Sequence, residues 1–251
     1  MSLKNLCTEQ IVRPPRILLY GQPGIGKTCW AADAPEPVFV LTEDGLLSVD
    51  PTPPHFPVAT TWNEVMDNLY SLLTEEHSFK TVVVDTLSEL EVLIWKDLCD
   101  KYGEKNIGDI GGGFGRGYSY ALDYWNEFRK LLDELNQKGM TIILTAHEGS
   151  QEVRDPENIT YDRIAPQIHA KAEALLTRWC DNVFEARQKY RVKENNEGFS
   201  QTRGIVSPVG RDGGDRIIRT VGSPACIAKN RFNLPAELPL SYKAFEEAIC
   251  G

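Results

Sequence analysis

The sequence predicts an α/β fold with a mostly parallel sheet, helices on both faces, and an antiparallel extension toward the C-terminus. Up to about residue 180, four short apolar runs alternate with stretches in which apolar residues recur at helical spacing. Strands that alternate with helices favour a parallel sheet covered on both faces. Beyond residue 180 the segments are short and β-like, between turns rich in glycine and asparagine, which indicates antiparallel strands added to the same sheet.

The length of the chain, 251 residues, is sufficient for one large hydrophobic core. No internal repeat or low-complexity linker interrupts the sequence. We therefore expect a single domain over residues 1–251, with a core at 15–180 and a β-rich extension with a closing helix at 181–251.

The four strands expected in the core are short runs of apolar residues. The first ends at a glycine, and the second and third end in carboxylates, so polar groups are expected at the strand ends. The four segments are RILLY (16–20), PVFVLTED (37–44), KTVVVD (80–85) and MTIILTAH (140–147).

Helices are expected between these strands. One should begin at Lys27, and another is opened by TWNE (61–64), which is a capping box. Three stretches carry apolar side chains at helical spacing, which defines an inner face on each. These faces consist of Trp62, Val65, Met66, Leu69, Leu72 and Leu73; of Leu87, Leu90, Leu93, Ile94 and Leu98; and of Trp125, Phe128, Leu131, Leu132 and Leu135.

The C-terminal extension is expected to contain short strands separated by turns, and then a closing helix at 241–249. The predicted strand segments are VFEARQKYRVK (183–193), RGIVSPVG (203–210), DRIIRTVG (215–222) and ACIAKNRF (225–232).

The net charge of −9 argues against nucleic-acid binding through the overall field of the protein. The charge is uneven, because residues 171–231 hold 12 basic and 7 acidic residues, a net +5, so that the rest carries −14. No apolar run predicts a transmembrane helix, and the N-terminus lacks the apolar stretch of a signal peptide. Six scattered cysteines without a CxxC pair are typical of free thiols, so we expect a cytoplasmic protein.

The segment GQPGIGKT (21–28) fits the phosphate-loop pattern G-x-x-x-x-G-K-[ST] and lies between a predicted strand and a predicted helix. Its glycines allow backbone N–H groups to turn toward a phosphate. Lys27 would reach the β- and γ-phosphate oxygens of ATP, and Thr28 would bind Mg²⁺. The nucleotide-binding residues predicted here are Gly21, Gln22, Pro23, Gly24, Ile25, Gly26, Lys27, Thr28 and Cys29.

Carboxylates at the ends of two other strands complete this prediction. Asp85 ends the buried run VVVD and is placed to hold Mg²⁺ through a water, beside Thr28. Glu43 and Asp44 end the second strand, which we expect to lie next to the phosphate-loop strand. Either carboxylate is a candidate general base for hydrolysis, and a role in a surface turn is an equal alternative.

Several classes of phosphate-loop protein are disfavoured. The chain has no Asn-Lys-x-Asp guanine-binding motif and no Leu-Ser-Gly-Gly motif, which argues against a GTPase and an ABC ATPase. A two-domain helicase needs about twice the length. A small-molecule kinase fits the length, but such enzymes usually have an arginine-rich lid, and the corresponding region is rich in glycine or acid.

The order of these parts resembles the RecA-like recombinase core. Within that family the chain is similar to the small phage nucleotide-binding proteins of the AAA_24 type, which include RecA-like single-strand annealing proteins. The pieces TEDG, VVVDT, LTAHE and KNRFNLP occur here in the same order, and the resemblance extends from about residue 15 to 248.

The resemblance implies roles for particular residues. Glu43 would be the catalytic glutamate, Asp85 the metal carboxylate, and His147 a polar sensor at a position often occupied by Gln. Lys229 and Arg231 would reach the nucleotide of a neighbouring subunit, so the resemblance also implies a homo-oligomer with nucleotide at its interfaces.

The second glycine-rich stretch, GGGFGRG (111–117), lies where the resemblance implies a DNA-binding loop. Phe114 would stack on a base, and Arg116 would pair with a backbone phosphate. The alternatives are a flexible connection or a lid over the nucleotide. The resemblance implies a second DNA loop at 148–168, but the segment has more acid than base, so either its tip contacts DNA or it contacts protein.

A further basic element is ARQKYRVK (186–193). On one strand, alternate residues share a face, so Arg187, Lys189, Arg191 and Lys193 would lie together, with Tyr190 opposite. Such a face would suit a phosphate backbone, and Arg211, Arg216 and Arg219 would extend it. The alternative is the solvated face of a hairpin.

From these observations we expect an ATPase that requires ATP and Mg²⁺, binds single-stranded DNA, and supports phage-type recombination or strand annealing. Two alternatives stay open at this stage. One is a nucleotide-dependent switch or assembly ATPase that acts on a protein partner, and the other is a small-molecule kinase.

Overall fold

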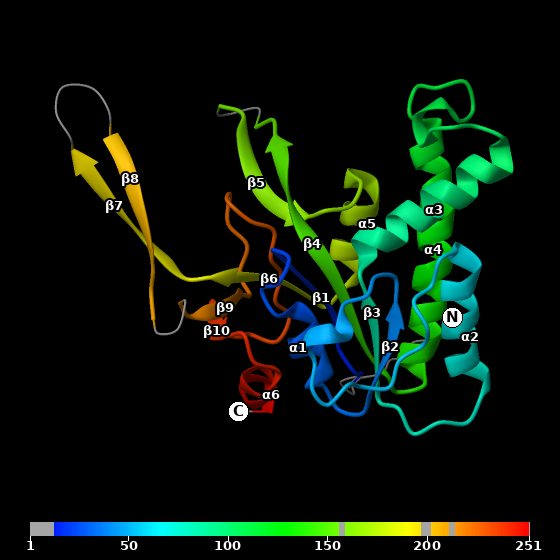
Figure 1. The fold of residues 1–251 in the computed structure, drawn as a ribbon, viewed down its shortest axis with the longest axis horizontal. Helices are drawn as coiled ribbons and strands as arrows, with labels where there is room; N and C mark the ends of the chain where they lie inside the picture. Colours follow the sequence, from blue (N-terminus) through cyan, green and yellow to red (C-terminus); the bar gives the residue numbers. More distant parts are fainter. Residues whose placement is uncertain (1–12, 156–158, 197–201, 211–213, 251) are drawn as a thin grey trace, which may run out of the picture.

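The computed structural model describes residues 13–155, 159–196, 202–210 and 214–250. Its main element is an eight-stranded sheet in the order β10-β9-β6-β1-β4-β3-β2, with β5 paired to β4 (Figure 1). The strands are β1 (Arg16–Gly21), β2 (Pro37–Leu41), β3 (Thr81–Asp85), β4 (Thr141–Val153), β5 (Tyr161–Pro166), β6 (Asn182–Gln188), β9 (Arg216–Arg219) and β10 (Glu237–Pro239).

The helices cover both faces of the sheet, as expected. They are α1 (Lys27–Ala32), α2 (Trp62–Thr74), α3 (Leu87–Tyr102), α4 (Arg116–Gln137), α5 (Ala170–Trp179) and α6 (Tyr242–Cys250), with short 3₁₀ helices η2 (Leu46–Ser48) and η3 (Ile107–Asp109). Helices α2, α3, α4 and α5 pack on one face, and α1 and α6 pack on the other. Helix α5 has no counterpart among the helices expected from the sequence.

Alternate side chains of each central strand enter different cores, which explains why these strands are apolar throughout. In β1, Leu18 and Tyr20 face the helices α2 to α5, whereas Ile17 and Leu19 face α1 and α6. All four are fully buried. A parallel strand that is covered on both faces has no polar side, so a continuous apolar run is the expected pattern.

Two helices begin with threonine caps, and the sequence indicates the first of them, in TWNE (61–64). The Thr61 side chain accepts a hydrogen bond from the backbone N–H of Glu64 at 3.2 Å, and Thr86 accepts one from Glu89 at 3.4 Å. These bonds satisfy N–H groups that the first turn of a helix leaves without partners.

The order of the strands differs from expectation at one point. Strand β2 lies at the end of the strand order and, among the described strands, pairs with β3 alone, so β3 and β4 separate it from β1. Glu43 and Asp44 therefore do not follow a strand that neighbours the phosphate-loop strand. Apolar runs show that a strand is buried, but they do not encode which strand pairs with it.

The described residues of the segment 148–168 form a β-hairpin, where the resemblance implied a loop. Strand β4 continues to Val153 beyond the sheet and pairs with β5 in an antiparallel register, with Glu148 opposite Pro166. Figure 1 shows this hairpin extending from the carboxyl ends of the central strands.

The C-terminal extension also departs from a simple antiparallel meander. Strand β6 runs parallel to β1, and β9 and β10 are the described strands of the extension that add antiparallel pairs to the main sheet. Strands β7 (Tyr190–Asn196) and β8 (Thr202–Pro208) form a separate two-stranded hairpin. The segment AKNRF is not a regular strand, since its only bridge pairs Lys229 with Val183.

Within the described ranges, no helix has both the length and the apolar character required to cross a bilayer. Four cysteines in these ranges are free, namely Cys29, Cys99, Cys180 and Cys226. Most of the N-terminal stretch that lacks a signal-peptide pattern, residues 1–12, lies outside the described residues.

Glu91 is a buried carboxylate on the inner side of α3, with 5% of its surface exposed. Both of its oxygens accept the backbone N–H of His169 at 2.9 Å. Burial raises its pKa to about 7, and the hydrogen bond from His169 opposes this shift. The folded state thus holds a proton that the unfolded chain releases near the ordinary pKa of a glutamate.

We expect the free energy of unfolding to fall as the pH rises from about 4.5 to 7. In this range the unfolded chain releases the Glu91 proton easily, whereas the folded state must ionise a buried carboxyl group. Glu91→Gln should remove a pH-dependent difference on the order of 2 kcal/mol in the free energy of unfolding. Urea unfolding at pH 5 and pH 8 measures it, with the exposed Glu104→Gln as the control. Equal pH dependence in Glu91→Gln and wild type would contradict the assignment.

A nucleotide site at the carboxyl ends of the central strands

The phosphate loop lies beside the polar residues that were predicted at the ends of two other strands. The carboxyl ends of β1, β3 and β4 bring them together. Gly21 ends β1 and lies in register with His147 on β4. Asp85 ends β3, on the other side of β4. These strand ends bring Gly21, Asp85 and His147 to the same side of the sheet, although the three residues are far apart in the sequence.

The phosphate loop surrounds the side chain of Lys27, which has 6% of its surface exposed. Its ammonium donates to the carbonyls of Gly21 at 3.0 Å and Gln22 at 3.1 Å. Burial lowers the pKa of Lys27, and three nearby carboxylates act in the opposite direction, those of Asp85, Glu43 and Glu148. The loop therefore holds a cation at its centre with acidic groups around it.

Two glycines of the loop have backbone conformations that other residues adopt only with strain. Gly24 has φ +75° and Gly26 has φ +111°. Gly26 is also the residue that immediately precedes α1, so the loop enters the helix through a left-handed turn. This geometry accounts for Gly26 of the pattern and for Gly24, which occupies one of its variable positions.

Oxygen ligands suitable for Mg²⁺ meet beside Lys27. The Thr28 hydroxyl donates to Asp85 Oδ2 at 2.9 Å, and the Thr145 hydroxyl donates to Asp85 Oδ1. Mg²⁺ prefers oxygen ligands such as hydroxyl and carboxylate groups, and it usually takes its remaining ligands from phosphate and water. Among the described residues, no group of three His, Cys, Asp or Glu side chains forms a metal site, so Mg²⁺ here would depend on those further ligands.

Gly45 provides the space for this cluster, a role that sequence inspection does not assign to it. A Cβ atom added to Gly45 would lie 3.0 Å from Asp85 Oδ2 and 3.5 Å from the Thr28 hydroxyl. The residue precedes η2, in the turn that follows β2. Any larger side chain would enter the space beside the oxygens that fit Mg²⁺.

The two candidate bases, Glu43 and Asp44, lie in different surroundings. Glu43 Oε2 lies 3.2 Å from His147 Nε2, and both side chains are partly buried. Asp44 is exposed. His147 is itself fixed by its backbone, because its N–H donates to the Ser88 hydroxyl at 3.1 Å. Glu43 is therefore the carboxylate that faces the strand ends and the phosphate loop.

Residues 13–232 match the family described as AAA domain. The chain belongs to this family. A search of the curated proteins finds no match. Membership supports a nucleotide-binding P-loop ATPase, in agreement with the loop, the strand order and the acidic strand ends.

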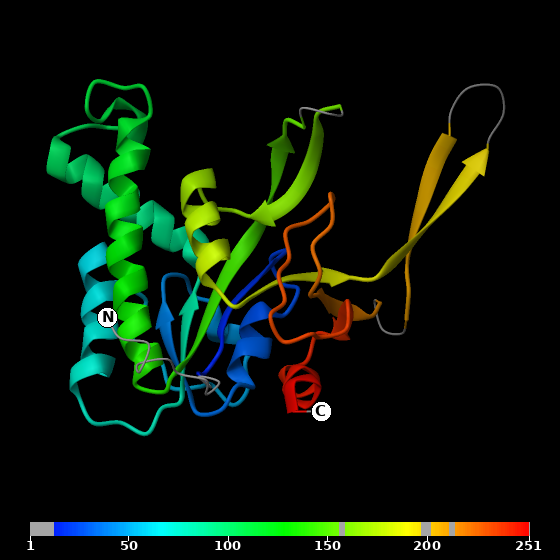
Figure 2. The same cartoon turned by 180° about the vertical axis from the view of Figure 1, so that it is seen from behind.

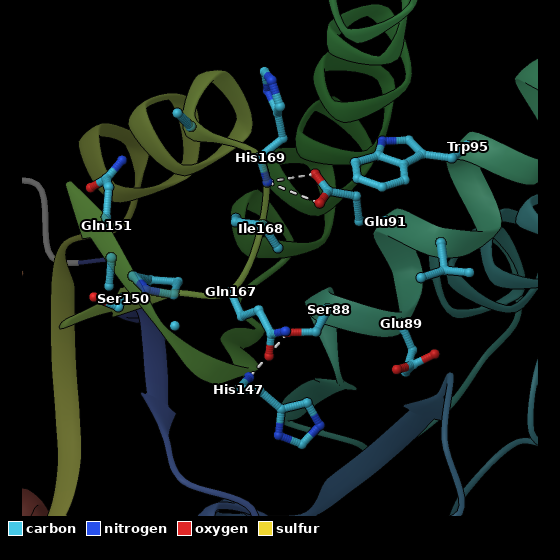
Figure 3. A pocket seen from close by; sticks show the side chains of 15 residues that line it. Ser88, Glu89, Glu91, Trp95, His147, Ser150, Gln151, Gln167, Ile168 and His169 are labelled. Atoms are coloured by element: carbon cyan, nitrogen blue, oxygen red, sulfur yellow. Dashed lines mark hydrogen bonds between the residues drawn. The ribbon is translucent and has the colours of Figure 1, made fainter. Parts of the chain in front are cut away.

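A pocket of about 490 Å³ lies on the other side of His147 in this AAA-domain protein. Figure 3 shows His147 at one end of it, with Ser88 and Gln167 nearby and Glu91 and Trp95 deeper along α3. The lining contains Glu89 and Glu91, and none of the described lining residues is a lysine or arginine. This side of the β4–β5 hairpin is unsuited to a phosphate backbone.

Lys229 and Arg231 lie at the opposite edge of the sheet from the phosphate loop, where β1 and β6 begin. The Lys229 ammonium donates to three carbonyls at the end of α5, those of Thr177, Arg178 and Cys180. Arg231 forms an ion pair with Asp181 at 3.0 Å, and about half of its side chain is exposed. Within one chain these cations stabilise the turn after α5, and any contact with nucleotide would be with that of another subunit.

The glycine-rich loop connects η3 to α4 and presents Phe114 to solvent. Phe114 is fully exposed and has a positive φ of +57°. Arg116 is the first residue of α4, and its guanidinium donates to the Gly111 carbonyl at 3.0 Å. Figure 2 shows this end of α4 on the same side of the molecule as the β4–β5 hairpin.

The single basic face predicted for residues 186–193 is wrong, because the chain leaves one strand and enters another at Lys189. Arg187 belongs to β6, and its guanidinium lies 4.7 Å from the ring centre of Tyr190, so these two residues are not on opposite faces. Lys189 pairs with Glu237 at 2.9 Å. Arg191 is exposed beside Tyr190 at the start of β7.

The arginines that were expected to extend this face do not form one patch. Arg219 pairs with Glu185 at 3.3 Å, and Arg216 contacts the phosphate loop. Arg211 lies outside the described residues.

The space beside Gly45 leads to a prediction. Gly45→Ala should reduce ATP turnover roughly tenfold at low Mg²⁺ and raise the Mg²⁺ concentration required, because its Cβ crowds the oxygens that fit the ion. ATPase rates measured across a Mg²⁺ titration report both effects. Gly108→Ala is the control, since a Cβ there meets no atom within 4 Å. An unchanged Mg²⁺ dependence in Gly45→Ala would contradict this role.

Proposed function

We propose that the protein is a RecA-like ATPase that hydrolyses ATP with Mg²⁺, binds single-stranded DNA, and supports phage-type recombination or annealing. The observation that carries the ATPase part is the cluster of Lys27, Thr28 and Asp85 facing the Glu43–His147 pair. Family membership supports the nucleotide chemistry in general.

Each residue of this cluster has a distinct task in hydrolysis. The Lys27 ammonium offsets charge on the terminal phosphates, and the Thr28 hydroxyl with the Asp85 carboxylate would hold Mg²⁺, which would neutralise phosphate charge when bound. The Glu43 carboxylate would orient the attacking water and accept its proton. His147 holds Glu43 through the contact of 3.2 Å and is thus a positioning residue.

The DNA-binding part of the proposal is supported by Phe114. An aromatic ring that is fully exposed on a glycine-rich turn is available to stack on an unpaired base, and stacking does not depend on base identity. Arg116 lies two residues away with an exposed guanidinium. The acidic pocket beside the β4–β5 hairpin leads us to assign the DNA contact to the glycine loop and not to this pocket.

Assembly into an oligomer is the part of the proposal that involves Lys229 and Arg231. Both cations lie far from the phosphate loop of their own chain, which is the placement required of residues that act on a neighbour. An arginine supplied to another subunit stabilises charge that develops on the transferred phosphate. Arg231 is the better candidate, because Lys229 is occupied by three carbonyls.

One observation favours a second candidate function, an ATPase that acts on a protein partner. The pocket next to His147 is lined by the Glu89 side chain and the Trp95 indole, and a carboxylate beside an aromatic ring suits a basic side chain of another protein. His147 lines this pocket and also contacts Glu43, so such a partner would be separated from the hydrolysis site by the His147 side chain.

The hydrolysis site can be tested with paired carboxylate variants. Glu43→Gln should retain ATP binding and lose turnover by roughly 10²–10⁴-fold, because the amide cannot accept the proton of water. Asp44→Asn is the matched control and should keep most of its turnover, since Asp44 is exposed. Lys27→Ala should abolish hydrolysis. If Asp44→Asn loses turnover and Glu43→Gln does not, the base is Asp44.

The DNA-binding proposal predicts that single-stranded DNA stimulates ATP turnover. Phe114→Ala should weaken binding to a fluorescent oligonucleotide roughly 5- to 100-fold while ATP binding is unchanged, because one stacked base is lost. Tyr70→Ala is the control, since Tyr70 is an exposed aromatic residue on α2. If the wild type neither binds the oligonucleotide at low salt nor responds to it, the protein-partner function is favoured.

A further inference from the structure

Strand β9 of the C-terminal extension carries Arg216 to the phosphate loop of its own chain. The guanidinium donates to the Ile25 carbonyl at 3.1 Å, although 191 positions separate the two residues. A Cβ added to Gly26 would lie 3.4 Å from the same nitrogen and 3.5 Å from Leu240. Arg216 and Leu240 therefore pack against the turn that leads into α1.

The backbone on both sides of Arg216 is held by the sheet. Arg216 pairs with Gln188 of β6, and its carbonyl accepts the N–H of Leu240 at 3.0 Å. The position of the guanidinium thus follows from strand pairing that does not depend on the phosphate loop. A side chain on a rigid strand can hold a nearby loop more firmly than one on another loop.

The charge of Arg216 is not neutralised within the described part of the chain. Its neighbours Arg187 and Arg219 both pair with Glu185, whereas no described carboxylate forms an ion pair with Arg216. The residue is exposed, and the bond to Ile25 uses one of five N–H donors. Arg216 therefore has charge and donors available for a ligand of the loop.

We propose that Arg216 is a nucleotide-binding residue that acts in cis: it holds the Ile25 carbonyl and presents a guanidinium to the phosphates of the bound nucleotide. Guanidinium groups bind phosphate through strong, directional hydrogen bonds and keep their charge at all accessible pH values. This inference rests on the proposed function that the loop binds ATP. It differs from the role of Lys229 and Arg231, which would act between subunits.

The test is nucleotide affinity in dilute solution, where subunits are separated. Arg216→Ala should weaken Mg²⁺–ADP binding about tenfold or more, measured by calorimetric titration. Arg216→Lys should bind more tightly than Arg216→Ala because the charge remains, whereas Arg216→Gln, which keeps a donor for Ile25 without the charge, should resemble Arg216→Ala. Arg178→Ala is the control, an exposed arginine at the far end of α5.

The outcomes separate this inference from the proposed function. If wild type binds no nucleotide, the proposed function fails. If wild type binds and Arg216→Ala binds equally well, only the role of Arg216 is overturned. If Arg216→Ala unfolds at a lower temperature, the Lys and Gln variants decide, because equal affinity in these two would show that charge is irrelevant and would also overturn the proposal.

Discussion

The buried carboxylate of Asp85 is the constraint on which the geometry of the site depends. It is fully buried, and a charged group in that position is costly unless hydrogen bonds replace the lost water. Its two oxygens accept hydroxyl groups from Thr28, at the start of α1, and from Thr145 on β4. Its backbone carbonyl accepts the N–H of Thr42, just after β2.

One residue thus links three other parts of the chain, and the positions of the remaining groups follow. Thr28 fixes the start of α1 and hence Lys27, the adjacent residue. Thr42 fixes the turn after β2 and hence Glu43, also adjacent. Because buried polar groups lose much of their stabilisation when a partner is removed, the cluster favours one arrangement of the loop, the helix and the strand ends.

The register between β1 and β4 adds a second constraint. Gly21 and His147 are partners in the pairing, and a shift by one residue would turn His147 toward the other face of the sheet. His147 would then not reach Glu43. The edge position of β2 is compatible with this contact, because the turn after β2 passes over the end of β3 before Glu43 meets His147.

Much of this arrangement could be predicted from the sequence because its signals are local. The phosphate loop combines glycines, Lys27 and Thr28 within eight residues, and Asp85 ends an apolar run, so each is recognisable without knowledge of the fold. The inner faces of α2, α3 and α4 follow from spacing in the same way. The resemblance to RecA-like proteins directed attention to Glu43 and His147, which the structure places in contact.

What could not be predicted depends on contacts between distant residues. The edge position of β2 and the parallel pairing of β6 are properties of the sheet, and neither leaves a mark within a single segment. The basic face at 186–193 was predicted from alternation, and alternation holds only while the strand continues, which it does not beyond Gln188. Gly45 has an ordinary backbone conformation, so its importance lies only in the closeness of Asp85.

The C-terminal extension is therefore part of the nucleotide site in a structural sense. Strands β6 and β9 connect the phosphate-loop strand β1 to Arg216, whose guanidinium contacts the Ile25 carbonyl of the same loop. Two further cations of the extension, Lys229 and Arg231, lie at the opposite end of the central strands. In an assembly, the C-terminal extension would thus contact two nucleotides. Arg216 would reach the nucleotide of its own chain, and Arg231 would reach that of a neighbouring subunit. Loss of the former contact would weaken binding even in an isolated subunit, whereas loss of the latter would be seen only after assembly.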